Sequence, residues 1–387
     1  MIRFKPDVII TIAWCVFGMS YRLLPVLLDN FREVSLVLLL IFTRKKLEFS
    51  NMHFVCIIFC VFYYLMSVFH EGIINSLQSS VSMISWVITL MVFSAYKKEK
   101  EDIKLLFDIV VVTSFIISII FLFNNELFSN EIIAHFNNDI VVNRNTVLYL
   151  TFPGYLFQLI KISKQKKNRM VDFIILGIIL FVCIQINSRT MYVSLMTCSL
   201  LVFNKQISAM MKRGNVFGII AFITLIIVAF ILIFSILPED YISREFTNGI
   251  ESSDTGRLSL WKEAIGFVDN PMLGKGPSFY ESAVPYGFGD YGAHNIFVDL
   301  YVSAGIIAPI IFATILSFFI NKDFLIIAII FPAFMTFTVE AGRIFFPYMM
   351  LIISWFIVSG AKQNGQTIDD YLYDCINQIE EHDNELL

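Results

Sequence analysis

The sequence has few charged residues, which make up 16% of its 387 residues, whereas 57% are hydrophobic. Average soluble domains carry about a quarter charged residues, so this composition excludes a water-soluble fold. The net charge of −4 is too small to indicate a nucleic-acid partner. The apolar residues, including 40 phenylalanines, recur in runs long enough to cross a hydrocarbon core. The composition therefore predicts an all-α, polytopic membrane protein.

Several signals of other protein classes are missing. The six cysteines lie in apolar runs or in the terminal tail, so we expect no disulfide scaffold. The sequence has no His-x-x-x-His, Asp-x-Asp or Gly-x-Ser-x-Gly pattern, so we expect neither a metal nor a cofactor. The stretch around Gly274 and Gly276 lacks the spacing of a phosphate loop, which argues against an ATPase. No internal repeat is visible, which weighs against a flippase built from two related halves.

Twelve membrane helices are predicted from the apolar runs. They lie at about residues 7–21, 26–43, 53–70, 77–96, 104–123, 146–162, 172–187, 190–204, 215–237, 296–320, 324–339 and 344–360. The chain is thus divided into nine helices (1–237), one long loop (238–295), three helices (296–360) and an acidic tail (361–387).

Basic residues are unevenly distributed between alternate loops. With the amino terminus inside, 19 of the 28 basic residues fall inside and nine outside. Basic residues in short loops are retained in the cytoplasm, so we predict cytoplasmic termini and a long loop on the outer side of the membrane. Lys262 and Lys275 are outside lysines, but both lie in the long loop, and long loops are translocated largely regardless of charge. The acidic tail shows apolar residues at helical spacing and predicts a cytoplasmic surface helix without evident chemistry.

The long loop carries eight of the 18 glycines and four of the ten prolines. Long structured loops are usually functional, so we expect the site here, on short helices. Arg257 begins an amphipathic segment in which Leu258, Trp261 and Ile265 share one face. Two interpretations of Arg257 are equally open. It binds an anion at the helix start, or it is a solvated residue of an interfacial helix.

Arg189 stands in a short outside turn between two predicted spans. Two interpretations have similar weight. The side chain is a headgroup anchor, or it is a diphosphate ligand, because guanidinium binds phosphate oxygens through paired hydrogen bonds.

His294 and Asn295 lie where the long loop meets the tenth span. An imidazole at this place is a candidate general base, although a lone histidine at a helix start is more often structural. Asn295 is expected to cap the helix that follows.

Several motifs follow one another between about residues 180 and 310. In chain order they are Ser188-Arg189-Thr190, Gly256-Arg257, Trp261, Asn270-Pro271, Gly274-x-Gly276, His294-Asn295-Ile296-Phe297 and a helix that carries Gly305. Together they resemble the bacterial O-antigen polymerase and ligase superfamily. The first 170 residues match only as hydrophobic spans.

The resemblance implies a glycosyltransferase whose donor is an oligosaccharide on undecaprenyl diphosphate, at the periplasmic face of the inner membrane. The essential histidine and two arginines of the ligase branch fall on His294, Arg189 and Arg257. His294 is then the general base. Arg189 and Arg257 hold the diphosphate, and Trp261 and Asn295 contribute to substrate binding.

The resemblance covers two activities. A polymerase, which we favour, joins lipid-linked repeat units into O-antigen or capsule polysaccharide, and the alternative is a ligase that transfers glycan to lipid A core. A third, non-catalytic alternative is a flippase for the same lipid-linked oligosaccharide. The implied partners are a lipid-linked donor and acceptor, membrane lipid and a chain-length regulator protein.

Overall fold

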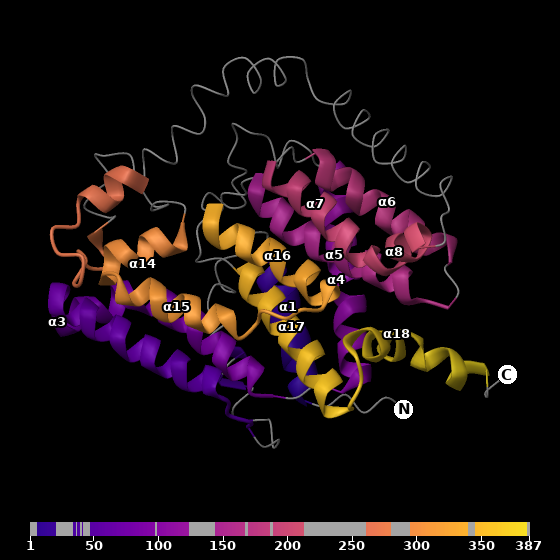
Figure 1. The fold of residues 1–387 in the computed structure, drawn as a ribbon, viewed down its shortest axis with the longest axis horizontal. Coiled ribbons are helices and arrows are strands. Elements are labelled where there is room, and N and C mark those ends of the chain that lie inside the picture. Colours follow the sequence, from indigo (N-terminus) through magenta and orange to yellow (C-terminus); the bar gives the residue numbers. More distant parts are fainter. Residues whose placement is uncertain are drawn as a thin grey trace, which may run out of the picture.

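A computed structural model describes most of the chain. The described residues are 6–20, 34, 35, 37, 38, 41, 47–96, 99–123, 144–166, 169–185, 189–212, 261–279, 295–339 and 345–384. They form helices, turns and connecting segments without any strand, which confirms the all-α class (Figure 1). The predicted span 215–237 and most of span 26–43 lie outside the described residues.

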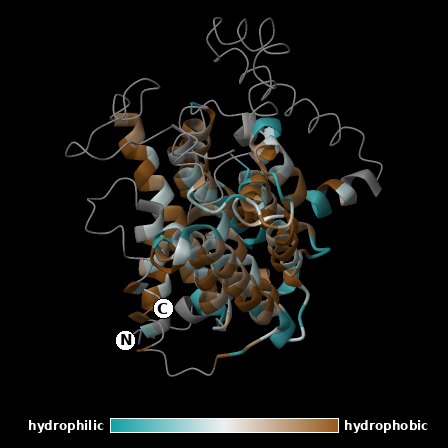
Figure 2. Ribbon diagram, turned by 90° about the vertical axis from the view of Figure 1, so that its left-hand side faces the viewer, coloured by the Kyte–Doolittle hydropathy of each residue, from teal (hydrophilic) through white to brown (hydrophobic). Residues whose placement is uncertain are grey.

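The described helices follow the predicted spans closely. They are α1 (Pro6–Ser20), α3 (Asn51–Ser94), α4 (Lys100–Phe123), α5 (Arg144–Lys164), α6 (Met170–Gln185), α7 (Arg189–Val202), α8 (Asn204–Lys212), α14 (Ile296–Ala304), α15 (Ile307–Ser317), α16 (Phe324–Val339), α17 (Phe345–Gln363) and α18 (Ile368–Asn384). Helices α3, α4 and α17 are long and apolar enough to cross a membrane, and several shorter helices are strongly apolar (Figure 2). The total of twelve spans is not confirmed.

Helix α3 is a hairpin. A straight helix of its 44 residues would be about 66 Å long. Instead, the N–H of Glu48, just before the helix, donates to the carbonyl of Ala95, just after it, at 3.0 Å. The chain reverses at Gly72, whose φ of 76° and ψ of 169° are available essentially to glycine alone. This hairpin confirms the two predicted helices 53–70 and 77–96, joined by a very tight turn.

The predicted tenth span, 296–320, is wrong as a single helix. It is broken at Gly305, where φ is 74°, into α14 and α15. In a straight helix Phe297 and Phe312 would be separated by about 22 Å. Their ring centroids lie 6.1 Å apart, so α14 folds back along α15. The start of α14 therefore lies inside the molecule, level with the middle of α15 (Figure 1).

Helix α18 marks one side of the molecule. It packs on α4, α5 and α17. Its Asp369 forms ion pairs with Lys164, at the end of α5, and with Lys205, just after α7, while Asp374 pairs with Lys100 at the start of α4. We call this the α18 side. The turn of α3 at Gly72 lies at the opposite end of the helices, since α3 begins and ends next to the start of α4, and we call this the Gly72 side.

Small residues set the packing of α4 on α5. A Cβ on Gly154 would lie 2.2 Å from the Cβ of Ser114. The Ser114 hydroxyl donates to the carbonyl of Leu150 at 2.7 Å and accepts the N–H of Gly154 at 3.1 Å. Close contact at small residues is typical of helices in lipid, where water does not drive association. The packing thus agrees with the composition.

Candidate functional site

A segment of the long loop is bonded to the break between α14 and α15. The N–H of Ile306 donates to the carbonyl of Pro271 at 2.8 Å, and the N–H groups of Lys275 and Gly276 donate to the carbonyls of Val302 and Ser303 at 2.6 and 3.0 Å. The last carbonyls of a helix have no partner within the helix, so the loop satisfies those at the end of α14. We call residues 271–276 with 302–306 the glycine joint.

Glycine is required on both sides of this joint. Gly274 has φ 75°, and a Cβ there would lie 2.7 Å from the backbone of Gly305 and of Val302. A Cβ on Gly305 would lie 2.3 Å from the carbonyl oxygen of Met272. No side chain fits at these distances, and L residues rarely adopt these φ values. The two glycines of the sequence motifs therefore meet in space.

The tip of the α3 hairpin holds the same loop through two side chains. The carbonyl of Leu273 only accepts, so His70 donates its Nε2–H to it, at 2.9 Å. Glu71 accepts the N–H of Ser278 at 2.8 Å and the hydroxyl of Ser79. Sequence reasoning missed both residues. The available signal was an adjacent imidazole and carboxylate at the end of an apolar run.

Trp261 belongs to the predicted amphipathic segment of the loop. Residues 261–266 are helical, and Trp261 is half-buried in an apolar cluster centred on Ala264 and Val302. The cluster also contains Phe267, Val268, Phe279, Val298 and Tyr301. The segment therefore packs on α14. The substrate-binding role of Trp261 stays a prediction, and Arg257, four residues earlier, lies outside the described residues.

Asn295 caps α14, as predicted. Its side-chain oxygen accepts the N–H groups of Phe297 and Val298 at 2.9 and 3.3 Å. Asn295 is 8% exposed, so the residue that follows His294 in the chain is buried. His294 itself lies outside the described residues. The roles of His294 as base and of Asn295 in substrate binding stay predictions.

Arg189 begins α7, and its side chain is not among those described. Helices α7 and α16 are antiparallel neighbours, because Lys205, after α7, lies near Asp323, before α16. Cys198 donates to the carbonyl of Ala328 at 3.2 Å. Arg189 is nine residues before Cys198, and Phe337 is nine residues after Ala328. Because the two helices are antiparallel, the backbones of Arg189 and Phe337 lie at the same level along them.

An aromatic layer of three phenylalanine rings connects α16, at Phe337, with α14. The ring of Phe337 lies 5.4 Å from that of Phe312, which lies 6.1 Å from that of Phe297. Phe297 is three residues after His294. The starts of α7 and α14 therefore approach one aromatic layer from two directions. Residues more than 100 positions apart in the sequence are carried to the same region by the folding back of α14.

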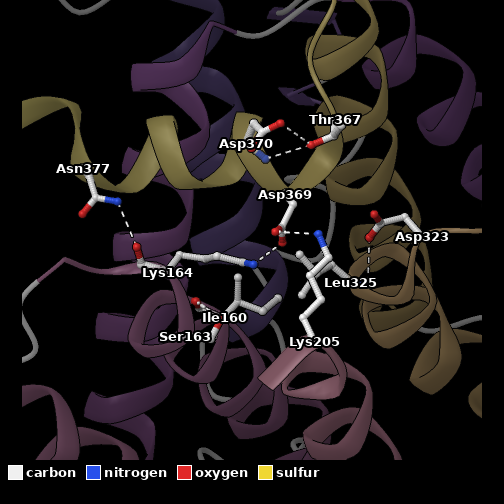
Figure 3. A network of polar contacts seen from close by, with 10 residues as sticks. All are labelled: Ile160, Ser163, Lys164, Lys205, Asp323, Leu325, Thr367, Asp369, Asp370 and Asn377. Carbon is white, nitrogen blue, oxygen red and sulfur yellow. Dashed lines mark hydrogen bonds and ion pairs between the residues drawn. The ribbon is translucent and has the colours of Figure 1, made fainter. Parts of the chain in front are cut away.

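The charged side chains on the α18 side form ion pairs with one another (Figure 3). Burial raises the pKa of Asp369, but hydrogen bonds and charges of Lys164 and Lys205 outweigh it and leave the pKa below its usual value. The hydrogen bond to Asp369 raises the pKa of Lys205. A hydrogen bond from Lys100 lowers the pKa of Asp374. These charges fasten α18 to the helix ends, which gives the predicted tail helix a structural role.

No metal site is evident in the described part of the chain, where no three histidine, cysteine or acidic side chains are grouped to hold an ion. The roles of Arg189 and Arg257 as diphosphate ligands stay predictions.

Residues 174–313 match the family described as O-antigen ligase. The match contains Arg189, Arg257, Trp261, His294, Asn295 and the glycine joint. It confirms the resemblance to the O-antigen polymerase and ligase superfamily for this part of the chain. It supports glycan transfer of the polymerase or ligase type without distinguishing the two, and with the apolar helices it indicates a multi-pass membrane protein. No curated protein and no solved structure matched the chain.

Proposed function

We propose that the protein is a polymerase that joins repeat units carried on undecaprenyl diphosphate, at the periplasmic face of the inner membrane. The product is an O-antigen or capsule polysaccharide. One observation carries the proposal. The matched family segment contains the starts of α7 and α14, and these approach the same aromatic layer.

The proposed chemistry uses residues of this chain. His294 takes the proton from the acceptor hydroxyl as its oxygen attacks the anomeric carbon of the donor. A new glycosidic bond forms, the bond to the diphosphate breaks, and undecaprenyl diphosphate leaves. Arg189 and Arg257 stabilise the charge that develops on the departing diphosphate. A glycosyl diphosphate is already activated, so the reaction needs neither ATP nor, with two arginines present, a metal.

The folding back of α14 supports this assignment. An ordinary spanning helix would begin at the membrane surface, exposed to water. Here Asn295 and Ile296 are 8% and 1% exposed, so α14 begins within the protein. Fixed charges and dipoles act more strongly within a protein than in water, which favours a general base directly before such a buried helix start. In the sequence, Trp261 lies four residues after Arg257, and Asn295 directly follows His294. We assign Trp261 and Asn295 to substrate binding.

The ligase is the second candidate, because the matched family is described as O-antigen ligase. We favour the polymerase on the stretch from His294 to Leu300, which resembles polymerase-like members. The acceptor then is a second lipid-linked unit, and a chain-length regulator is the expected partner. For the ligase the acceptor is lipid A core.

Deletion of the gene distinguishes the two. Loss of a polymerase should leave a single repeat unit on the lipid A core, provided that a separate ligase is present, and the ladder of long chains should vanish on electrophoresis. Loss of a ligase should leave a bare core while long chains accumulate on undecaprenyl diphosphate. The second result would refute the polymerase. A complementing plasmid with the wild-type gene is the control and should restore the ladder.

A further inference from the structure

We propose that His70 and Glu71, at the tip of the α3 hairpin, are positioning residues for the transfer reaction. They hold loop residues 273–278, and through the glycine joint they fix the place of α14 and of the segment 261–268. The inference rests on the proposed function. It assigns a role in the site to residues outside the matched segment 174–313.

The two side chains act as hydrogen-bond partners for the backbone of the loop. His70 donates to the carbonyl of Leu273 at 2.9 Å, and Glu71 accepts the N–H of Ser278 at 2.8 Å. The second carboxylate oxygen of Glu71 accepts the hydroxyl of Ser79, from the other half of the hairpin. The Glu71 side chain therefore joins three segments of the chain and is held in one orientation.

Polar contacts and not apolar packing attach the tip to the loop. Ile73 and Ile74, directly after the turn, are 68% and 83% exposed. The loop backbone also approaches the tip closely at Gly276, where a Cβ would lie 2.9 Å from the Cβ of His70. Removal of either hydrogen-bonding side chain should therefore release the loop without opening the apolar core.

The glycine joint connects the loop to the two elements that follow the predicted catalytic residues His294 and Arg257 in the sequence. Residues 271–276 are bonded to Val302, Ser303 and Ile306, at the vertex between α14 and α15. The segment that follows Arg257 packs on the same helix through Ala264. A shift of the loop thus moves the helix that follows His294 and the segment that follows Arg257. Chemical steps are sensitive to such shifts, since a displacement of about 1 Å can cost on the order of 100-fold in rate.

The test compares removal with conservative replacement. Glu71→Ala removes both bonds, whereas Glu71→Gln retains an oxygen for the N–H of Ser278 and an amide for Ser79. His70→Leu and His70→Gln form the same comparison at Leu273. Gln78→Ala is the matched control, because Gln78 is an exposed polar residue of the same hairpin tip. Each full-length variant is reconstituted in nanodiscs and assayed with lipid-linked repeat unit as donor and acceptor.

Two measurements are made on each variant. Hydrogen exchange of a peptide covering residues 273–279 reports the bond to Ser278 whether or not the protein is active. In Glu71→Ala exchange should become at least about tenfold faster and kcat should fall about 10- to 100-fold, with the donor KM within about threefold of wild type. Glu71→Gln and Gln78→Ala should stay within about threefold of wild type in both measurements.

Other outcomes overturn the inference. Normal kcat in Glu71→Ala with faster exchange would show that the contact does not position the reaction. Equal loss in Glu71→Gln and Glu71→Ala would show that the charge, and not the hydrogen bonds, matters. If Glu71→Ala does not accumulate, the pair at His70 decides by the same criteria. Absence of transfer by the wild type and by Gln78→Ala would refute the proposed function, and the exchange data would still report the contact.

Discussion

The two sides of the molecule are fastened in different ways. On the α18 side, long charged side chains join the ends of α4, α5 and α8 to α18. On the Gly72 side, backbone hydrogen bonds join a loop to a broken helix at glycines. A lysine can follow a carboxylate over several ångströms, whereas a glycine packed against backbone leaves no room for a shift. The tighter construction involves residues 271–276, which lie between the predicted catalytic residues Arg257 and His294 in the sequence.

Cysteine labelling tests which side of the molecule faces the periplasm. We expect the cysteine on one side to react completely and the cysteine on the other side not to react. Met272 is 53% exposed on the Gly72 side, and Gln363 is exposed near α18. Met272→Cys should react with a membrane-impermeant maleimide in intact spheroplasts, and Gln363→Cys only after permeabilisation. The wild type, with five buried cysteines and a half-buried Cys60, gives the background. Labelling in the opposite sense would place the predicted site in the cytoplasm.

His294→Ala should cause the largest loss of activity. Removal of a general base typically lowers turnover by about two to four orders of magnitude. Binding of the lipid-linked donor, measured by equilibrium binding in nanodiscs, should be retained because the base acts on the acceptor. His382→Ala, in the acidic tail, is the control and should behave as wild type. If donor binding and turnover fell together, His294 would be a ligand of the donor and not a base.

Arg189→Lys and Arg257→Lys should each lose most activity although the charge remains. A lysine cannot form the two parallel bonds of a guanidinium with a diphosphate, and one such contact is worth about two to three orders of magnitude in rate. Arg169→Lys, an exposed residue on the α18 side, is the control. Wild-type turnover in both lysine variants, at equal protein level, would reduce these arginines to headgroup anchors.

Gly305→Ala tests the glycine joint. The added Cβ would lie 2.3 Å from the carbonyl oxygen of Met272, at a φ of 74°. Such a backbone conformation costs about 1–3 kcal/mol in a residue other than glycine. We expect a lower melting temperature in detergent and roughly tenfold lower turnover, as α14 shifts. Gly177→Ala is the matched control, because a Cβ on that helical glycine meets nothing within 4 Å. Equal behaviour of the two variants would show that the joint tolerates displacement.

Asp369→Asn should have the smallest effect, on the α18 side. The two ion pairs of this partly exposed carboxylate are worth about 1 kcal/mol together. We expect faster release of α18 in limited proteolysis with little change in turnover. The pKa of Asp369 is lowered by its lysines from an ordinary 3.8, so the contribution is complete above that value and is lost as the pH falls through the lowered pKa.

The pH dependence supplies the check on this prediction. Wild type and Asp369→Asn should differ in proteolysis at pH 7 and converge in strong acid. Asp370→Asn is the control, because that carboxylate accepts the Thr367 hydroxyl at 2.6 Å within the first turn of α18. A difference between Asp369→Asn and wild type that persists when the carboxylate is protonated would show that the lysines are not its cause.

Much of the fold could be predicted from the sequence, because helices in lipid must be apolar for their whole length. The runs that predict helices 104–123 and 324–339 coincide with α4 and α16 within a few residues. The cap at Asn295 was predicted for a similar local reason, since an asparagine directly before an apolar run accepts the first free N–H groups. The helical tail was predicted from its period, but its ion pairs with α4, α5 and α8 were not.

Other features depend on partners far away in the chain. The run 296–320 is continuous in hydropathy, so nothing local shows that it breaks. A Gly-Ile pair within an apolar run is compatible with an intact helix. The break is stabilised by carbonyl and N–H groups of residues 271–276, some 30 positions earlier. His70 and Glu71 are more than 200 positions from the loop that they hold, so no spacing rule could have joined them to it.

Composition determines that the chain is helical and apolar, because each apolar run forms its helix independently of the others. The placement of lysines predicts one orientation in the membrane for the same local reason. The order of motifs further indicates the O-antigen polymerase and ligase superfamily, and the family match over residues 174–313 confirms this resemblance. Which helix starts meet is decided by tertiary structure alone. The reversal at Gly305 carries the start of α14 into the protein toward the level of Arg189. That reversal needs glycines from two segments and the backbone hydrogen bonds between these segments, and the two are brought together only in the folded chain.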